Sequence, residues 1–255
     1  MRKSDAAPRI EPRAHPVGRA IAVYGVVPAD AAGRKFVVDG KRTVVVRWGN
    51  VGLVTGYVDP VEFSPGEIER RRTDRKWLRE RARHHERVLE RLGPEVSVLP
   101  AALLTAYEGP ASLEEAVRKR GARWRTALRR VAGKSEYALH VFAGPHAPGE
   151  PEPYVLRVSA RARREKRGAV REEAQEQSPV EAHVARLWDA CVAAADDARR
   201  FDAPGLRGFA LGAALLVDDA AAAELQLALS NLTSEGRELG VTVYLEGPRL
   251  PYTFG

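Results

Sequence analysis

The sequence predicts an α+β protein of two domains, and three features of its 255 residues support this prediction. Residues 19–58 hold successive β-rich segments, which are typical of an antiparallel meander. Three Ser-x-x-Glu patterns follow, and each is typical of the first turn of a helix. After residue 133, strand and helix patterns alternate. We therefore expect a disordered arm over residues 1–18, an N-terminal domain over 19–133 and a C-terminal domain over 134–255.

The strands of the N-terminal domain are expected to form a β-meander with helices packed on it. Apolar side chains occupy both faces of the first strand, from Ile21 to Val27, which indicates a central position in the sheet. The segments 35–38, 43–48 and 51–58 are separated by Asp-Gly and Gly-Asn pairs, which favour tight turns.

Three helices are expected to begin at Ser64, Ser112 and Ser178, because a glutamate follows each serine by three residues. In such a capping box the serine oxygen accepts an amide hydrogen of the first turn, and the glutamate reaches back to the serine amide. Proline directly follows Ser64 and Ser178, where a missing amide hydrogen costs nothing. Apolar periodicity extends these helices to about residues 92, 131 and 199.

The C-terminal domain is expected to have the element order β-β-α-β-α-β. An antiparallel sheet with both helices on one face accommodates this order, and the layout resembles a modified ferredoxin-like fold. The charged segment 160–176 is expected to be an exposed helix that frays into a link. The other expected strands and helices span residues 136–142, 154–158, 180–199, 208–217, 219–232 and 241–245.

The composition is strongly basic, with a net charge of +7, and this allows a nucleic-acid-binding surface. Residues 70–87 and 157–171 are the candidate footprint. Acidic residues are interleaved with the arginines of the first segment, and neither an aromatic RNA-binding signature nor a Cys/His finger accompanies them. The pattern therefore favours solvated helix faces and disfavours nucleic acid as a partner.

The sequence also bears on the compartment. No apolar run approaches the roughly 20 residues of a membrane span, and no apolar stretch follows the amino terminus as in a secretory signal. A single cysteine, Cys191, excludes an internal disulfide framework and fits a reducing compartment. We expect a cytoplasmic protein that does not engage a membrane.

No set of residues in the sequence predicts catalysis or cofactor binding. The segment 133–135 reads Gly-Lys-Ser like the end of a phosphate loop, but Leu128 stands where that motif needs glycine. His84 and His85 are adjacent and cannot chelate a metal as an i, i+4 pair does. The aspartates at 218–219 fit helix capping better than a magnesium site. We expect no enzyme activity, no cofactor, no metal and no small-molecule substrate.

The carboxyl end is the most distinctive part of the chain. Residues 247–255 read Gly-Pro-Arg-Leu-Pro-Tyr-Thr-Phe-Gly after an alternating strand, and this ending resembles the GvpF/GvpL family of gas vesicle accessory proteins. The prolines and two aromatic rings predict a structural tail that folds back over the C-terminal domain. The residues that match the family are Gly247, Pro248, Pro251, Tyr252 and Phe254.

Further landmarks of the same family occur in order from about residue 20. The segment 24–28 resembles its opening strand, and the segment 98–100 resembles its Val-Leu-Pro. Residues 101–104 depart from the Leu-Arg-Phe-Gly that the family has next. The remaining matches, in the central helix and before a later strand, include Asp74, Trp77, His85, Pro100 and Glu136.

The resemblance implies a non-enzymatic accessory protein, either a minor vesicle component or an assembly factor, at the gas vesicle. Its implied partners are the hydrophobic shell protein and other gas vesicle accessory proteins. Such a partner could be held by helix-in-groove packing or by strand addition. Leu103, Leu104 and Tyr107 are candidate contacts, because their apolar segment fits neither a helix nor a strand pattern. The alternative is a basic nucleic-acid-binding module.

Overall fold

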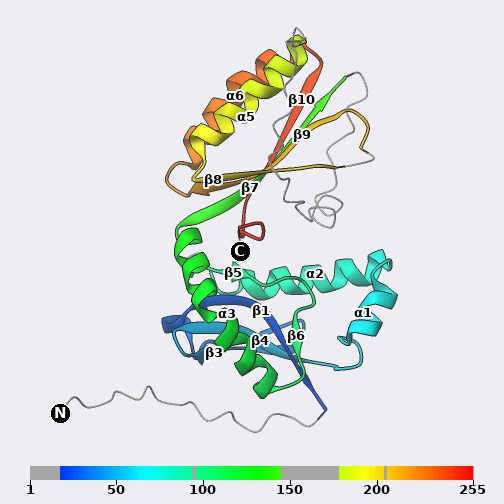
Figure 1. The fold of residues 1–255 in the computed structure, drawn as a ribbon, viewed down its shortest axis with the longest axis vertical. Coiled ribbons are helices and arrows are strands. Elements are labelled where there is room, and N and C mark those ends of the chain that lie inside the picture. Colours follow the sequence, from blue (N-terminus) through cyan, green and yellow to red (C-terminus); the bar gives the residue numbers. More distant parts are fainter. Residues whose placement is uncertain (1–17, 94–95, 145–177, 204–205, 255) are drawn as a thin grey trace, which may run out of the picture. The chain divides into compact units, whose positions relative to one another are not determined.

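The computed structural model describes residues 18–93, 96–144, 178–203 and 206–254, and the chain divides into two compact units (Figure 1). The first unit runs to Ala132 and also includes Leu250–Gly255, whereas the second is Gly133–Arg249. Each unit combines helices with one antiparallel sheet, so the predicted α+β class is confirmed. The arm expected at residues 1–18 lies almost entirely outside the described residues.

The first sheet is the predicted meander with two short strands added to it. Its order is β2-β3-β4-β1-β5, and β6 also pairs with β1. The first strand is central, as its apolar faces indicate, because β4 lies on one side of it and the short strands lie on the other. The strands are β1 (Ala20–Pro28), β2 (Lys35–Val38), β3 (Lys41–Trp48), β4 (Val51–Val58), β5 (Leu99–Pro100) and β6 (Ala106–Tyr107).

The helix expected from Ser64 to residue 92 is two helices, α1 (Pro65–Arg71) and α2 (Arg75–Glu90). Ser64 Oγ accepts the Glu67 amide hydrogen at 3.3 Å, as predicted, but the Glu67 carboxylate pairs with Arg70 and Arg71 and the predicted bond back to the Ser64 amide does not form. Asp74 then begins a new helix, because its carboxylate accepts the Trp77 amide hydrogen at 3.0 Å. The second cap explains why one apolar pattern corresponds to two helices.

The third helix, α3 (Pro110–Val131), begins earlier than the sequence predicted. Gly109 is its N-cap, and Ser112 lies inside the first turn. The Ser112 hydroxyl accepts the Gly109 amide hydrogen at 3.2 Å instead of capping the helix itself. Pro110 at the first helical position favours this earlier start, since its missing amide hydrogen costs nothing there.

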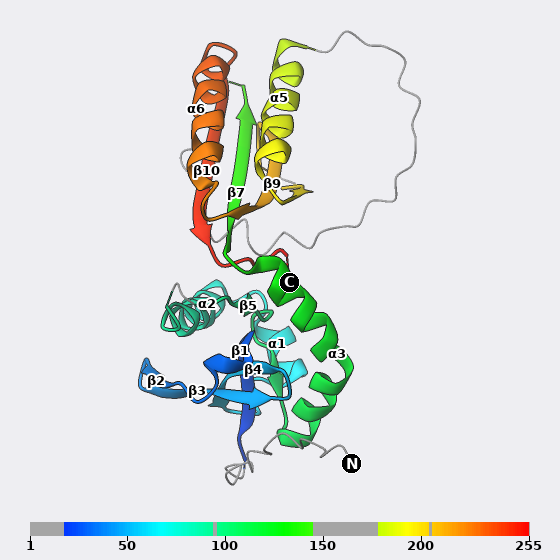
Figure 2. The ribbon, with the colours of Figure 1, turned by 90° about the vertical axis from the view of Figure 1, so that its left-hand side faces the viewer.

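The second unit has a four-stranded sheet in the order β10-β7-β9-β8. Helices α5 and α6 lie side by side on one face of it (Figure 2), which confirms the predicted layout. Ser178 and Glu181 form the predicted capping box, with both reciprocal hydrogen bonds. The elements are β7 (Lys134–Ala143), α5 (Pro179–Ala194), β8 (Asp197–Phe201), β9 (Phe209–Asp218), α6 (Ala222–Glu238) and β10 (Val241–Arg249).

Strand β8 corrects the sequence-based prediction, which extended the preceding helix to residue 199. Helix α5 ends at Ala194, and β8 pairs along its length with β9. The ladder of hydrogen bonds that β9 offers outweighs the helical preference of an alanine-rich segment. The strand expected at residues 154–158 and the helix expected at 160–176 lie outside the described residues.

The carboxyl tail is structural, but it packs on the first unit and not on the C-terminal domain as predicted. Leu250 and Tyr252 pack against the core of the first unit, and Phe254 is only 1% exposed. The Arg130 guanidinium of α3 lies over the Phe254 ring, 5.9 Å from its centroid. The sequence shows that the aromatic rings need a partner surface, yet it does not show which unit supplies that surface.

Candidate partner-binding site

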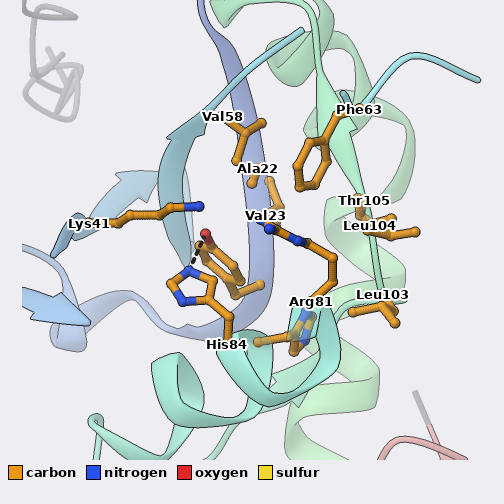
Figure 3. Close-up of a pocket in the computed structure, with 12 residues that line it drawn as sticks. Ala22, Val23, Lys41, Val58, Phe63, Arg81, His84, Leu103, Leu104 and Thr105 are labelled. Atoms are coloured by element: carbon orange, nitrogen blue, oxygen red, sulfur yellow. Dashed lines mark hydrogen bonds between the residues drawn. The ribbon is translucent and has the colours of Figure 1, made fainter. Parts of the chain in front are cut away.

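A pocket lies in the first unit, between α2 and the sheet and beside the segment that joins β5 to β6 (Figure 3). Its cavity volume is about 20 Å³, and the empty space reaches about 350 Å³ when open solvent at the mouth is included. Its lining is apolar on one side and basic on the other. The main lining residues are Ala22, Tyr24, Val58, Phe63, Arg81, His84, His85, Leu103 and Leu104, together with Lys41 at the start of β3.

Small residues explain why the sheet leaves space under α2. Thr43, Gly56, Ala22 and Ala106 lie in one row across four neighbouring strands. These four residues are too small to fill the layer between the sheet and the helix. Gly56 also makes room for Tyr24, because a Cβ at that position would lie 3.2 Å from the phenol oxygen.

The inner end of the pocket is a chain of hydrogen bonds through Tyr24, His84 and Asp39. His84 Nδ1 lies 2.7 Å from Asp39 Oδ2, and Tyr24 Oη lies 3.2 Å from His84 Nε2. A carboxylate only accepts, so Nδ1 is the donor, and Nε2 of a neutral ring accepts the phenol hydrogen. Arg87 donates to the same Asp39 oxygen at 2.7 Å.

These contacts set the charge of the inner groups. Hydrogen bonds from Arg87 first, and then from His84, lower the pKa of Asp39, so its carboxylate stays ionised at neutral pH. Burial raises the pKa of Tyr24 to about 12, so the phenol keeps its hydrogen. The inner end is therefore a polar network whose hydrogen-bonding groups are paired with one another.

His85 connects the pocket to the carboxyl tail. Its ring centroid lies 5.6 Å from that of Tyr24 and 6.0 Å from that of Tyr252. Burial, with a smaller contribution from His84, lowers the pKa of His85 to about 4, so the ring is neutral at pH 7. Three landmarks that are far apart in the sequence thus meet beside the pocket: the opening strand, the central helix and the tail.

The other landmark residues hold elements together. Asp74 caps α2, and the Trp77 indole Nε1 donates to Glu62 at 2.9 Å. Pro100 lies in β5, opposite Gly25 of the central strand. These residues determine where α2 and the short strand β5 lie, and both elements border the pocket.

In the second unit, the landmarks Glu136 and Gly247 fix the conformation of the last strand just before the tail. Arg249 donates to the buried Glu136 carboxylate at 3.1 Å. Gly247 has a φ of 143°, and a Cβ there would lie 2.6 Å from the Tyr137 ring. This position therefore requires glycine. Pro248 follows in the last strand.

Two of the three candidate contact residues line the pocket. Leu103 is 37% exposed at its rim, and Leu104 follows with a φ of 67°. Tyr107 is half-buried in β6 opposite Ile21, whereas the pocket uses the neighbouring Ala22. Because side chains alternate along a strand, Tyr107 lies on the other side of the sheet from the pocket.

Strand addition does not fit at this site, because the edge of β1 is already paired. Short strands β5 and β6 cover its two halves. Between them, the Val23 amide donates to Thr105 O at 3.0 Å, and the Ala101 amide donates to Tyr24 O at 2.9 Å. Of the two binding modes considered from the sequence, helix-in-groove packing and strand addition, the second therefore does not fit at this edge.

The single cysteine and the aspartates at 218–219 have structural surroundings. Burial raises the pKa of the Cys191 thiol to about 12, so it is not a thiolate nucleophile at neutral pH. Asp218 accepts the Ala220 amide hydrogen at 2.9 Å, and Asp219 accepts the Ser135 hydroxyl at 2.6 Å. Within the described ranges, no three His, Cys, Asp or Glu side chains gather as a metal site. No helix in the part of the chain that the structure describes is long and apolar enough to cross a membrane.

Sequence reasoning missed the polar side of the pocket. Lys41, Arg81 and the Asp39–His84 pair come from separate elements, and each is unremarkable in its own segment. The Asp39-Gly40 pair indicated only a turn. The sequence offered one indication of this side of the pocket: Arg81 is a charged residue on the otherwise apolar face of α2.

Comparison with known proteins identifies the family. The model of the family described as gas vesicle synthesis protein GvpL/GvpF matches residues 20–255. The chain therefore belongs to this family. It is also 29% identical over 243 residues to gas vesicle protein L of Streptomyces sp. strain CB03234, covering 90% of this chain and 88% of that protein.

Solved structures show the same fold. The crystal structure of the gas vesicle protein GvpF from Anabaena sp. PCC7120 aligns with a TM-score of 0.62 at 13% identity, covering 92% of this chain and 98% of that one. GvpF from Microcystis aeruginosa aligns with a TM-score of 0.60 at 13% identity over the same shares. The similarity extends across both units.

Proposed function

We propose that this protein is a non-enzymatic accessory protein of gas vesicle formation that binds the hydrophobic shell protein. It acts in the cytoplasm, as an assembly factor or as a minor component of the vesicle, together with other accessory proteins. Membership of the GvpL/GvpF family supports the link to gas vesicles. The pocket and its apolar rim support the role in binding.

The observation that carries this proposal is the exposed leucine at the rim of the pocket. Leu103 and Leu104 follow β5 in a turn, and both line the pocket (Figure 3). Phe63 and Val58 continue the apolar wall. An apolar segment of a partner would cover this wall and remove it from water, which is the main driving force of such contacts.

The charge pattern argues against the nucleic-acid alternative. In the basic segment 70–87, five of the nine Lys and Arg residues form ion pairs with acidic side chains, at distances from 2.6 to 3.6 Å. Paired arginines offer less to a phosphate backbone than free ones do. The other basic segment, residues 157–171, lies outside the described residues.

Leu103→Ser tests the proposal. The shell protein of the same organism, fused to a soluble carrier, serves as the probe in a binding titration. Leu103 is 37% exposed, so covering the exposed part of its side chain is worth about 0.5–1 kcal/mol, and we expect Leu103→Ser to weaken binding roughly two- to sixfold. Leu227→Ser is the matched control, because Leu227 is 68% exposed on α6 and does not line the pocket.

Equal loss of affinity in both leucine variants, or no loss in either, would contradict a binding role for the rim. Absence of binding by the unchanged protein would contradict the proposed function itself. A titration with duplex and single-stranded nucleic acid at physiological salt completes the comparison. Tight, salt-sensitive binding there would favour the alternative function.

A further inference from the structure

The basic side of the pocket carries the charges of Lys41 and Arg81, and of these two Arg81 alone has an acidic neighbour within ion-pair distance among the described residues. Lys41 lines the pocket, and it forms no ion pair with any of the described residues. Arg81 lines it from α2, with its Nε 3.6 Å from Glu62 Oε1 and without a hydrogen bond to it. Figure 3 shows both side chains reaching into the pocket from different sides.

The two carboxylates near this part of the pocket are held by other donors. Asp39 accepts from His84 and Arg87 at 2.7 Å each. Glu62 accepts from the Trp77 indole at 2.9 Å. Neither carboxylate forms an ion pair with the Lys41 ammonium group in the described structure, so this group can accept a carboxylate from a partner.

The apolar wall lies next to this charge. Val58, Phe63, Leu103 and Leu104 line the same pocket as Lys41. A ligand that pairs with the basic residues and also covers the apolar wall therefore needs a carboxylate and, close to it, apolar groups. A polypeptide segment supplies both, because side chains i and i+2 of an extended chain lie on one side, about 7 Å apart.

We propose that the pocket anchors an acidic side chain of the bound shell-protein segment, while the neighbouring apolar side chains of that segment pack on Leu103 and Leu104. This inference rests on the proposed function and adds the chemistry of the segment that is recognised. Lys41 supplies the charge for the carboxylate at the mouth, and Arg81 supplies it deeper in the pocket. The apolar rim provides affinity, and the charge selects the register of the segment.

Lys41→Met tests the anchor, because it removes the charge and keeps an unbranched side chain at an exposed position. The probe is the carrier-fused shell protein, titrated at low and at high salt. We expect Lys41→Met to bind about tenfold more weakly at low salt and to lose most of the salt dependence of the unchanged protein. Lys35→Met is the control, since Lys35 is an exposed residue of β2 outside the pocket.

A second experiment identifies the carboxylate. The acidic residues of the shell protein are changed one at a time to the corresponding amide. One change should weaken binding to the unchanged protein about tenfold and have no further effect on Lys41→Met, which is the signature of a coupled pair. Additive effects at every acidic position would overturn the anchor.

The outcomes separate the two proposals. If Lys41→Met and Lys35→Met both bind like the unchanged protein while Leu103→Ser binds weakly, the acidic anchor is wrong and the binding role stands. If the unchanged protein does not bind the shell protein, both proposals fail. Circular dichroism of each variant, expected to be unchanged, shows that the fold is intact.

Discussion

The two sheets of this chain use their helix-covered faces differently. In the second unit, α5 and α6 cover a continuous aliphatic layer in which Leu139, Leu215 and Val217 have no exposed surface. In the first unit, the face below α2 includes a row of small residues and the Tyr24–His84–Asp39 network. A filled layer supports stability, whereas an incompletely filled one leaves a pocket in which a partner can bind. On this basis we propose that the second sheet serves mainly stability and that the first serves recognition.

Of the changes that test this comparison, loss of the tail contact should lower the unfolding free energy of one unit the most. Phe254→Ala removes a buried ring, and we expect the first unit to lose about 3–5 kcal/mol of unfolding free energy. In a Trp188→Phe background the remaining tryptophans, at positions 48, 77 and 124, all lie in the first unit and report its unfolding in urea.

Tyr57→Ala is the control for the tail variant, because Tyr57 is 47% exposed in the same unit and should cost much less. A loss of stability confined to the second unit would restore the original expectation that the tail closes the C-terminal domain.

Leu215→Ala tests the role of the second sheet. Leu215 is fully buried in the layer under α5 and α6, so we expect a loss of about 2–5 kcal/mol in the second unit. Native-state hydrogen exchange at the β9 amides measures this loss directly. The control Leu227→Ala, at an exposed position of α6, should stay within about 0.5 kcal/mol of the unchanged protein. A cost below 1 kcal/mol for Leu215→Ala would refute the filled layer.

Acid should lower the unfolding free energy of both units, because each contains a buried histidine whose pKa is lowered by folding. Burial lowers the pKa of His85 and of His140 to about 4, and charge on His84 and Arg249, respectively, acts in the same direction. The unfolded chain, with pKa values near 6.5, takes up these protons first, so stability is complete above pH 6.5 and falls between pH 6.5 and 4. Each histidine contributes about 3 kcal/mol at most.

Urea unfolding at several pH values measures this acid effect, and His85→Gln should reduce the pH dependence of the first unit alone. A first unit of constant stability from pH 6.5 to 4 would show that His85 is protonated without cost in the fold.

Sequence reasoning found the features that are encoded locally. Ser178 and Glu181 lie three residues apart, and their capping box forms as predicted. The carboxyl motif identified the family, because its order of glycine, prolines and aromatic rings is distinctive. Leu103, Leu104 and Tyr107 stay predicted contacts: the first two line the pocket, whereas Tyr107 does not.

Features that depend on distant partners were not predictable in the same way. Strand β8 exists because β9 offers it a partner, and the sequence of the segment 197–201 does not indicate this pairing. The tail motif predicts burial of Phe254 but does not identify the surface on which it packs. Lys41 and Arg81 meet only after the sheet and α2 have come together.

Hydrogen exchange of the full chain with and without the carrier-fused shell protein tests the central claim most directly. The account predicts slower exchange of the amides in α2 and in residues 99–107 of the first unit, with α6 of the second unit unchanged. Protection confined to α5 and α6, with the pocket segments unaffected, would contradict the assignment of recognition to the first sheet.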